Sequence, residues 1–191
     1  RVKPNGRLAI SNINWNVFNV EGENVRVITR SNGTFEGTVQ LCNASIHVNP
    51  DPYQVRDLNK NMEIVLDQDV RSAEDVQELG IESGDPIALD PRFRITDTGY
   101  VKSRFLDDKA SVTALLTLAN WVSSHRPVLS RRVDLLFTAF EELGHGGACG
   151  IARDTVELIA VDMGCVGEDI HCTERQVSIC TKDNSGPYNR Q

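Results

Sequence analysis

The sequence predicts an α/β protein whose N-terminal half is rich in β-strands. A helical apolar pattern covers residues 107–125, and two continuous apolar runs follow it at residues 133–140 and 158–161. Such runs are typical of strands buried on both faces of a parallel sheet. Between residues 14 and 95, short apolar segments separated by turn residues predict in addition a small β-sandwich or barrel.

The β-rich part contains the clearest local signals. Asn32-Gly33 predicts a type I′ hairpin turn, which needs positive φ values at both central positions. Ser72, followed three residues later by an acid, predicts the start of a short helix over residues 73–79 that ends at Gly80. Strands are expected where apolar and β-branched residues gather between turn signals, at residues 7–13, 25–29, 35–41, 62–66, 87–89 and 93–95.

The α/β pattern begins after this part, so the chain divides into residues 1–13, 14–95 and 96–191. The first 13 residues are either a strand of the α/β domain or the start of the β-rich part. In the third part, the expected helix collects apolar residues on one face at a spacing of about 3.6 residues. They are Val112, Leu115, Leu116, Ala119 and Val122.

The composition of the chain argues against some classes of binding partner. The net charge of -7 argues against nucleic acid or an anionic membrane, because phosphate binding needs a basic surface. No apolar run approaches the roughly 20 residues of a membrane span, and the first residues lack the apolar core of a signal peptide. The five cysteines form no CxxC pair, which favours free thiols in a reducing compartment. These features predict a cytoplasmic globular protein.

Acidic residues recur where apolar elements begin or end. Asp107 and Asp108 open the expected helix, Glu141 and Glu142 end the first apolar run, and Asp162 ends the second. Singly, these residues are typical of caps, turns and solvated surface pairs. Parallel strands align their C-terminal ends, however, so these carboxylates should converge, and converging carboxylates repel one another unless cations neutralise them. The sequence therefore predicts a divalent metal site.

Four segments carry a family resemblance. SRFLDDKASV, LLFTAFEELGHGGA and LIAVDMG resemble the tetrahedral aminopeptidases and their glutamyl-aminopeptidase relatives, and TKDNSGPYNRQ is similar to a segment of bacterial members. The resemblance implies part of a metallopeptidase α/β/α (phosphorylase/hydrolase-like) catalytic domain, with residues 14–95 as an inserted barrel-like dimerisation domain. It also implies a peptide substrate and a homo-oligomer, from a dimer up to a dodecamer.

The resemblance also implies a role for each acid. Asp107 would bridge two divalent metal ions, with Glu142 ligating one and Asp162 the other. Asp108 would help to fix the ligand geometry, and Glu141 would be the general base that takes a proton from the metal-bound water. Carboxylate-rich ligation suits zinc first, with cobalt or manganese as alternatives. His145, in the glycine-rich turn, is interpreted as a loop residue rather than a ligand.

Two histidine ligands of the family pattern have no counterpart in this sequence. One belongs to an upstream HxD segment and the other lies near the family's C-terminus. We expect the chain to be part of a longer protein; the alternative is a relative that kept the acids and lost catalysis. Either way, this polypeptide alone should bind metal weakly and turn over slowly or not at all, and two tight sites in a zinc or cobalt titration would contradict that expectation.

The function predicted from these residues is that of a metallo-aminopeptidase. It would remove N-terminal residues from peptides with a metal-activated water. A related dinuclear-metal amidohydrolase or deacylase would use the same acids, so only substrate profiling separates the two. The alternative from another class is a non-catalytic oligomerisation module of a degenerate relative.

Overall fold

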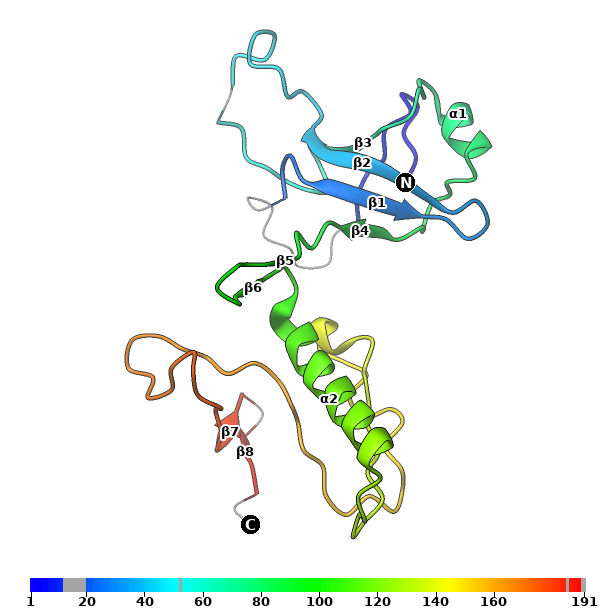
Figure 1. Ribbon diagram of the computed structural model, residues 1–191. Helices are drawn as coiled ribbons and strands as arrows, with labels where there is room; N and C mark the ends of the chain where they lie inside the picture. Colours follow the sequence, from blue (N-terminus) through cyan, green and yellow to red (C-terminus); the bar gives the residue numbers. More distant parts are fainter. Residues whose placement is uncertain (12–19, 52, 185, 190–191) are drawn as a thin grey trace. The chain divides into compact units, whose positions relative to one another are not determined.

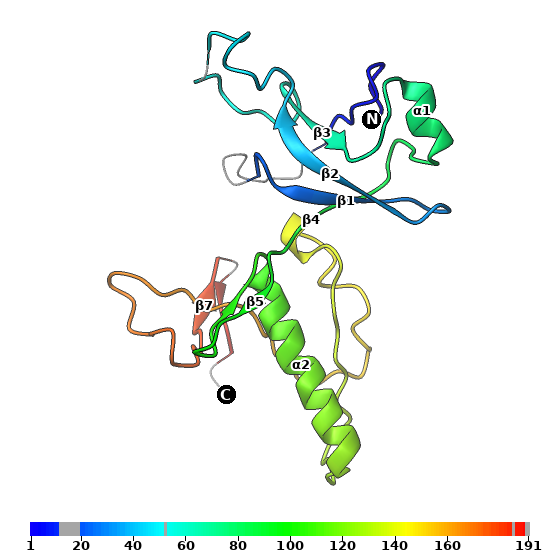
Figure 2. The same cartoon turned by 45° about the horizontal axis from the view of Figure 1, so that its top comes forward.

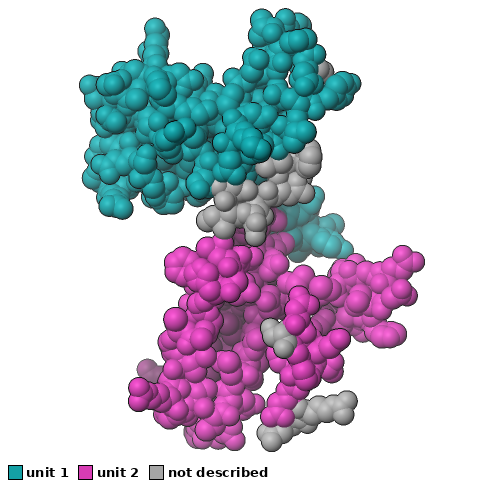
Figure 3. Space-filling model, turned by 180° about the vertical axis from the view of Figure 1, so that it is seen from behind, with its two compact units in different colours: residues 1–102 teal, residues 103–191 magenta. Residues whose placement is uncertain are grey.

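The computed structural model describes residues 1–11, 20–51, 53–184 and 186–189. These residues form two compact units, Arg1–Lys102 (unit 1) and Ser103–Gln191 (unit 2), which Figure 3 shows in teal and magenta. The division near residue 102 does not test the expected boundaries after residues 13 and 95, which stay predictions.

Unit 1 is built on a four-stranded antiparallel sheet in the order β3-β2-β1-β4 (Figure 1). The strands are β1 (Asn24–Ile28), β2 (Thr34–Leu41), β3 (Met62–Leu66) and β4 (Ile87–Leu89). All four lie where the sequence predicts strands, within one residue at each end. The predicted strand at residues 93–95 forms a separate two-stranded ribbon of β5 (Arg94–Ile95) and β6 (Val101–Lys102).

One face of the sheet forms the hydrophobic core. Val25 and Val27 of β1 are buried, whereas their neighbours point outward, as expected for alternating side chains. Ile64 and Met62 of β3 are almost fully buried on the same core. Among the described residues, every buried hydrophobic side chain belongs to unit 1, so this unit holds the core of the chain.

The N-terminal segment joins the edge of this sheet. Leu8 exchanges backbone hydrogen bonds with Ile64, at 3.0 and 2.9 Å, and it is buried. This is an isolated bridge, so the strand predicted over residues 7–13 is wrong for residues 7–11, and residues 12 and 13 lie outside the described residues. Of residues 7–11, only Leu8 pairs with the sheet as the alternating pattern predicted.

The short helix α1 (Ala73–Glu78) confirms the predicted start and end signals. The Ser72 hydroxyl accepts a hydrogen bond from the Asp75 backbone, and the Asp75 carboxylate accepts one from the Ser72 backbone. This reciprocal capping box satisfies two of the N–H groups that a helix leaves free at its start. Gly80 has a φ of 78°, the left-handed conformation that ends many helices.

The β1–β2 hairpin differs from the predicted type I′ turn. Gly33 has a positive φ of 89°, but Asn32 does not have a positive φ. The loop is longer than two residues, because the Thr29 backbone N–H donates to Gly33 O at 2.9 Å. The Thr29 hydroxyl accepts from the Asn32 backbone, and the Asn32 side chain donates to Leu79 O at 3.1 Å. The bond to Leu79, at the end of α1, and the bonds within the loop together favour this longer turn.

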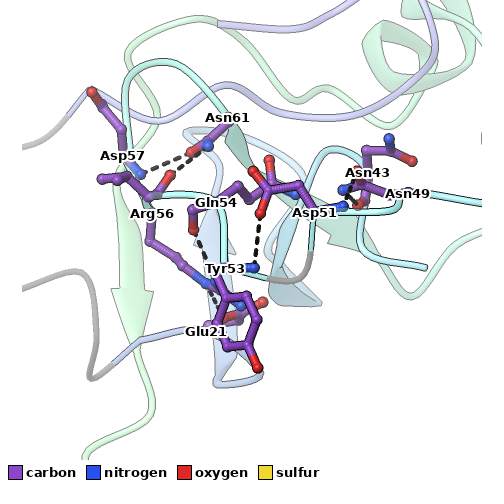
Figure 4. A network of polar contacts seen from close by, with 10 residues as sticks. Glu21, Asn43, Asn49, Asp51, Tyr53, Gln54, Arg56, Asp57 and Asn61 are labelled. Carbon is purple, nitrogen blue, oxygen red and sulfur yellow. Dashed lines mark hydrogen bonds and ion pairs between the residues drawn. The ribbon is translucent and has the colours of Figure 1, made fainter. Parts of the chain in front are cut away.

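The loop between β2 and β3 is held by its own polar side chains (Figure 4). Asn61 receives a hydrogen bond from the Asp57 backbone at 2.8 Å and donates one to Val55 O at 2.6 Å. Arg56 binds Glu21 at 2.7 Å, which ties the loop to the segment before β1. These bonds order the loop although it buries little apolar surface.

Unit 2 is organised along the helix α2 (Leu106–His125), with the following chain running back beside it (Figures 1 and 2). Val112, Leu115, Ala119 and Val122 are half-buried on one face, as predicted. Leu116 was expected on the same face but is 55% exposed. Two residues on the outer side, Leu118 and Trp121, are also exposed, so α2 is apolar on both faces.

The two strands predicted after α2 are not formed. Residues 133–140 and 158–161 have no ladder partner, and Val133 and Ile159 are 59% and 74% exposed. All ladders in the described residues are antiparallel, so the predicted parallel sheet is also absent there. A strand exists through hydrogen bonds to a neighbour, which an apolar run cannot supply by itself.

The remaining ladder of unit 2 is a short hairpin of β7 (Lys182–Asp183) and β8 (Gly186–Pro187). Within the described residues, α2 and the other helices are too short or too polar to traverse a lipid bilayer.

Candidate metal centre

Three carboxylates from two distant segments of the sequence meet in unit 2. Asp107, Asp108 and Asp162 each offer an oxygen atom, and these atoms lie within 4.8 Å of one another. Asp108 is half-buried, and the other two are exposed. Oxygen atoms at these separations can share one hard or borderline cation, so the cluster has the composition of a divalent metal site.

The start of α2 departs from helical geometry where it bears the acids. Phe105, before the helix, has a positive φ of 62°, and Asp107 and Asp108 have φ, ψ values of -82°, 111° and -112°, 35°. Neighbouring residues of a regular helix project roughly 100° apart, which would separate the two carboxylates. The non-helical backbone at Asp107 and Asp108 instead lets these adjacent carboxylates reach the same cluster.

Asp162 is presented from an extended segment. Its Oδ1 accepts a hydrogen bond from the backbone N–H of Met163 at 2.6 Å, which restrains the carboxylate. Two residues on, Gly164 lies against Ser178: a Cβ atom at Gly164 would be 2.4 Å from the Ser178 Oγ and 2.8 Å from its Cβ. The absence of a side chain at residue 164 therefore allows the two extended segments to approach.

Glu141 and Glu142 begin the 3-10 helix η2 (Glu141–Leu143). Gly144, with a φ of 76°, ends it and donates its N–H to Glu141 O at 2.7 Å. The turn is closed by Phe140 and His145, whose rings stack with centroids 5.1 Å apart, and His145 N–H also donates to Phe140 O at 3.2 Å. His145 thus packs on the turn and is not one of the clustered ligand groups.

The electrostatics of Glu142 connect it to the cluster. Its pKa is raised, first by desolvation and then by the negative charges of Asp107, Glu141, Asp162 and Asp108. Carboxylates disfavour ionisation of a neighbouring carboxyl group, and a cation among them would reverse that effect. Glu142 therefore shares the field of all four other acids that the sequence singled out.

Asp108 provides a separate test of whether a cation fits. Its Oδ1 is buried, and no hydrogen-bond donor reaches it among the described residues. A buried carboxylate oxygen without a donor carries a desolvation penalty that a metal ion or a water bound to it would remove. The carboxylate-rich donor set and this oxygen both fit a divalent metal.

The site residues predicted from the sequence are thus found in three relationships. Asp107, Asp108 and Asp162 are clustered directly, Glu142 is coupled to them through its charge, and Glu141 lies next to Glu142 in η2. The individual roles of bridging ligand, terminal ligand and base stay predictions.

Tyr188 is a nearby residue that sequence reasoning missed. Its hydroxyl donates to Asp183 Oδ2 at 2.9 Å, and its pKa is raised mainly by that bond, with a contribution from Asp162. The negative charge of Asp162, a candidate ligand, therefore acts on Tyr188, which directly follows the β7–β8 hairpin.

A cavity of about 330 Å³ lies at this hairpin, lined by Thr181, Lys182, Pro187, Tyr188 and Asn189. Tyr188 lies in the segment TKDNSGPYNRQ, whose resemblance to the family could have singled it out, but that resemblance assigned no role to any residue of the segment.

Comparison with known families shows to which family the chain is related. The profile of the M42 glutamyl aminopeptidase family matches residues 1–191, which is the whole chain. The chain belongs to this family. Its members are generally metal-dependent peptidases, in keeping with the acid cluster. Among curated proteins, this M42 chain is 42% identical over 191 residues to YhfE of Bacillus subtilis (strain 168), which is assigned by name as an aminopeptidase. The match covers 100% of this chain and 55% of YhfE, so the chain spans about half the length of that relative.

Solved structures show the same fold over part of the chain. Aminopeptidase APDkam598 from the archaeon Desulfurococcus kamchatkensis gives a TM-score of 0.53 at 22% identity, covering 63% of this chain and 32% of its own. The TET aminopeptidase from the marine sediment archaeon Thaumarchaeota archaeon SCGC AB-539-E09 gives 0.56 at 17% identity, covering 67% and 36%. At these identities the similarity concerns the fold, which confirms a mixed α/β class.

Proposed function

We propose that this chain supplies the carboxylate side of a metal-dependent aminopeptidase that removes N-terminal residues from peptides. One observation carries the proposal: Asp107, Asp108 and Asp162 come together from distant segments in a member of the M42 family. A surface module without catalytic function has no need for carboxylates that repel one another, because their repulsion destabilises the fold.

We infer that Asp107, Glu142 and Asp162 hold the metal, with Asp107 shared between two ions. Carboxylate oxygens suit zinc, cobalt and manganese, of which zinc is our first choice. When bound, such ions polarise the scissile carbonyl group and lower the pKa of the attacking water. Asp108 acts from its half-buried position by orienting its neighbour Asp107, since groups behind metal ligands set their geometry.

Glu141 is proposed as the general base. It begins η2 directly before the proposed ligand Glu142, which supports a position for its carboxylate next to the attacking water. Its carboxylate would accept a proton from the attacking water and return it to the nitrogen of the leaving amine. A ligated carboxylate is a poor base because the cation holds its electron pairs.

The decisive experiment compares substitutions of the neighbouring residues Glu141 and Glu142 in the full-length protein. Glu141→Gln should lower kcat by about 10²- to 10⁴-fold, the usual contribution of general-base catalysis, with the metal content unchanged. Glu142→Gln should instead lower the metal content. Glu168→Gln, at an exposed acid outside the cluster, serves as the control and should change neither. Unchanged hydrolysis of aminoacyl-p-nitroanilides by the Glu141→Gln protein would overturn the assignment.

The oligomeric state is a separate part of the proposal. We infer a homo-oligomer in which unit 1 makes the contacts, because this unit contains the buried core and an independent sheet on which an interface can be built. The similarity of the chain to a TET aminopeptidase is consistent with assembly into a homo-oligomer. Sedimentation velocity of the full-length protein tests this, and a monomer at micromolar concentration would contradict it.

A further inference from the structure

A lysine, a cysteine and a glutamate, none of them part of the acid cluster, meet in unit 1. Lys3 Nζ lies 2.7 Å from Glu63 Oε2 and 3.3 Å from Cys42 Sγ. Cys42 is an exposed free thiol, and the Glu63 side chain is only 8% exposed. The three groups therefore place a primary amine in contact with a sulfur atom that solutes can reach.

Backbone hydrogen bonds hold both partners of this contact. Lys3 N–H donates to Arg7 O at 2.8 Å, and Lys3 O accepts from the N–H of Gly6 at 3.1 Å. Cys42 directly follows β2, and its N–H donates to Asn61 O at 2.8 Å. The backbones of Lys3 and Cys42 are thus both anchored by hydrogen bonds, and the Lys3 side chain bridges the remaining gap to the Cys42 Sγ.

Glu63 keeps the lysine in place. Its register partner Gln40 lies two residues before Cys42, so the carboxylate sits beside the end of β2. The pKa of Lys3 reflects a balance: burial acts to lower it, and the bonds to Glu63 and Cys42 outweigh that effect and raise it. Most Lys3 is therefore an ammonium at neutral pH, and the fraction of neutral amine grows as the pH rises.

We propose that Lys3 and Cys42 are a modification site at which hydroperoxides create a covalent nitrogen–sulfur cross-link. The Cys42 thiol is first oxidised to the sulfenic acid, while the peroxide is reduced and one water leaves. The neutral amine of Lys3 then attacks the sulfur. The N–S bond forms, the S–O bond breaks, and the hydroxyl group leaves with the amine proton as a second water, giving a sulfenamide.

The cross-link would tie the N-terminal segment to the end of β2. Closing the chain between residues 3 and 42 reduces the freedom of the unfolded state, so unit 1 should melt at a higher temperature after oxidation. A dithiol reductant attacks the sulfur, restores the thiol and the amine, and should reverse the shift. The expected device is a reversible, oxidant-dependent stabilisation of unit 1.

Mass spectrometry after mild hydrogen peroxide treatment tests the proposal. Digestion without reductant should yield a cross-linked pair of peptides containing Lys3 and Cys42, lighter by two hydrogen atoms than the separate peptides. Its yield should increase with pH and disappear with dithiothreitol. Exposed Cys149, Cys165 and Cys180 are internal controls, because no lysine hydrogen-bonds to these thiols in the described part of the chain.

Two lysine variants separate chemistry from charge. Lys3→Arg keeps a cation next to Cys42, but the guanidinium stays protonated and cannot condense, so the cross-link and the rise in melting temperature should be lost. Lys60→Arg, at a lysine paired with Asp57, should leave both unchanged. Oxidation of Cys42 to sulfinic acid without the linked peptides, or equal cross-linking in the Lys3→Arg protein, would overturn the proposal.

Discussion

Gly164 and Ser178 approach so closely that a methyl group on Gly164 would lie 2.4 Å from the Ser178 Oγ. Gly164 is two residues from Asp162, whose carboxylate belongs to the acid cluster. The contact between the two extended segments therefore helps to position a proposed metal ligand, although neither Gly164 nor Ser178 can bind a metal well itself.

Gly164→Ala should weaken metal binding. The added Cβ would overlap the Ser178 Cβ, at 2.8 Å, so the backbone around Asp162 has to move. Ligand misplacement of this kind costs about 10- to 100-fold in metal affinity when groups supporting a ligand are changed. Zinc titration by calorimetry on the full-length protein measures the effect.

Two further variants make this test specific. Ser178→Gly removes both overlapping atoms, so the double variant should recover most of the affinity. Gly167→Ala adds the same methyl group at a position with no atom within 4 Å of the built Cβ and should bind zinc normally. A Gly164→Ala protein with unchanged zinc affinity would show that this contact does not position Asp162.

Asp108→Asn should lower metal affinity less than Asp162→Asn does. Asp162 is a proposed ligand, and its amide would be a weak one. Asp108 acts by orientation, so we expect a loss of about 10- to 100-fold, the usual range for supporting groups. Glu174→Gln, an exposed acid that does not contribute to the raised pKa of Glu142, is the control. Equal losses for Asp108→Asn and Asp162→Asn would make Asp108 a direct ligand.

Ile64→Ala should destabilise unit 1 by about 2–5 kcal/mol, because it opens a cavity in the core. Ile64 is 0% exposed and pairs with both Val39 and Leu8. The matched change Ile28→Ala, in the same sheet at a side chain that is 42% exposed, should cost less than about 1 kcal/mol. Urea unfolding followed by circular dichroism compares them, and equal costs would contradict the assignment of the core.

The capping box of α1 should contribute stability that depends on pH. Ser72→Ala should cost about 1 kcal/mol at neutral pH, the usual value for an N-cap. The pKa of Asp75 is lowered below 3.8, mainly by the backbone hydrogen bond from Arg71 and then by Ser72. A lowered pKa means that the contribution is complete above pH 3.8 and is lost as the pH falls through the folded-state value.

Asp75→Asn should accordingly be less stable than the parent protein at neutral pH, and the difference should shrink in acid. Glu74→Gln, at the neighbouring acid of the same first turn, is the matched control because Glu74 makes no capping bond. Unfolding curves recorded from pH 7 to pH 3 test this. A difference that stays constant over that range would mean that the Asp75 carboxylate does not cap the helix.

Unit 1 was predictable because its signals are local. β3 and β4 match the predicted strands at both ends, and the Ser72 cap and Gly80 bound α1 as expected. Alternating side chains and capping residues act within a few positions, so short sequence windows contain the determining interactions. The β1–β2 turn departed from prediction where a distant residue, Leu79, binds Asn32.

Unit 2 was less predictable because its elements depend on distant partners. The apolar runs at residues 133–140 and 158–161 have the composition of buried strands, but the described chain offers them no ladder. α2 shows the same dependence: its pattern predicts a single apolar face, whereas Leu118 and Trp121 lie exposed on the outer side. Periodicity identifies a surface that can be buried, and only a neighbouring element buries it.

For the candidate site, the sequence alone predicts five acids, and their individual roles stay predictions. The positions of Asp107, Asp108, Glu141, Glu142 and Asp162 are given by the sequence alone, and the resemblance of the segments around them implied the family that the profile match shows. Only the tertiary structure decided that three of these carboxylates lie within 4.8 Å of one another and that Glu142 shares their field. Asp107 and Asp108 are neighbours, but their approach to Asp162 against charge repulsion depends on contact between distant segments, which no local pattern encodes.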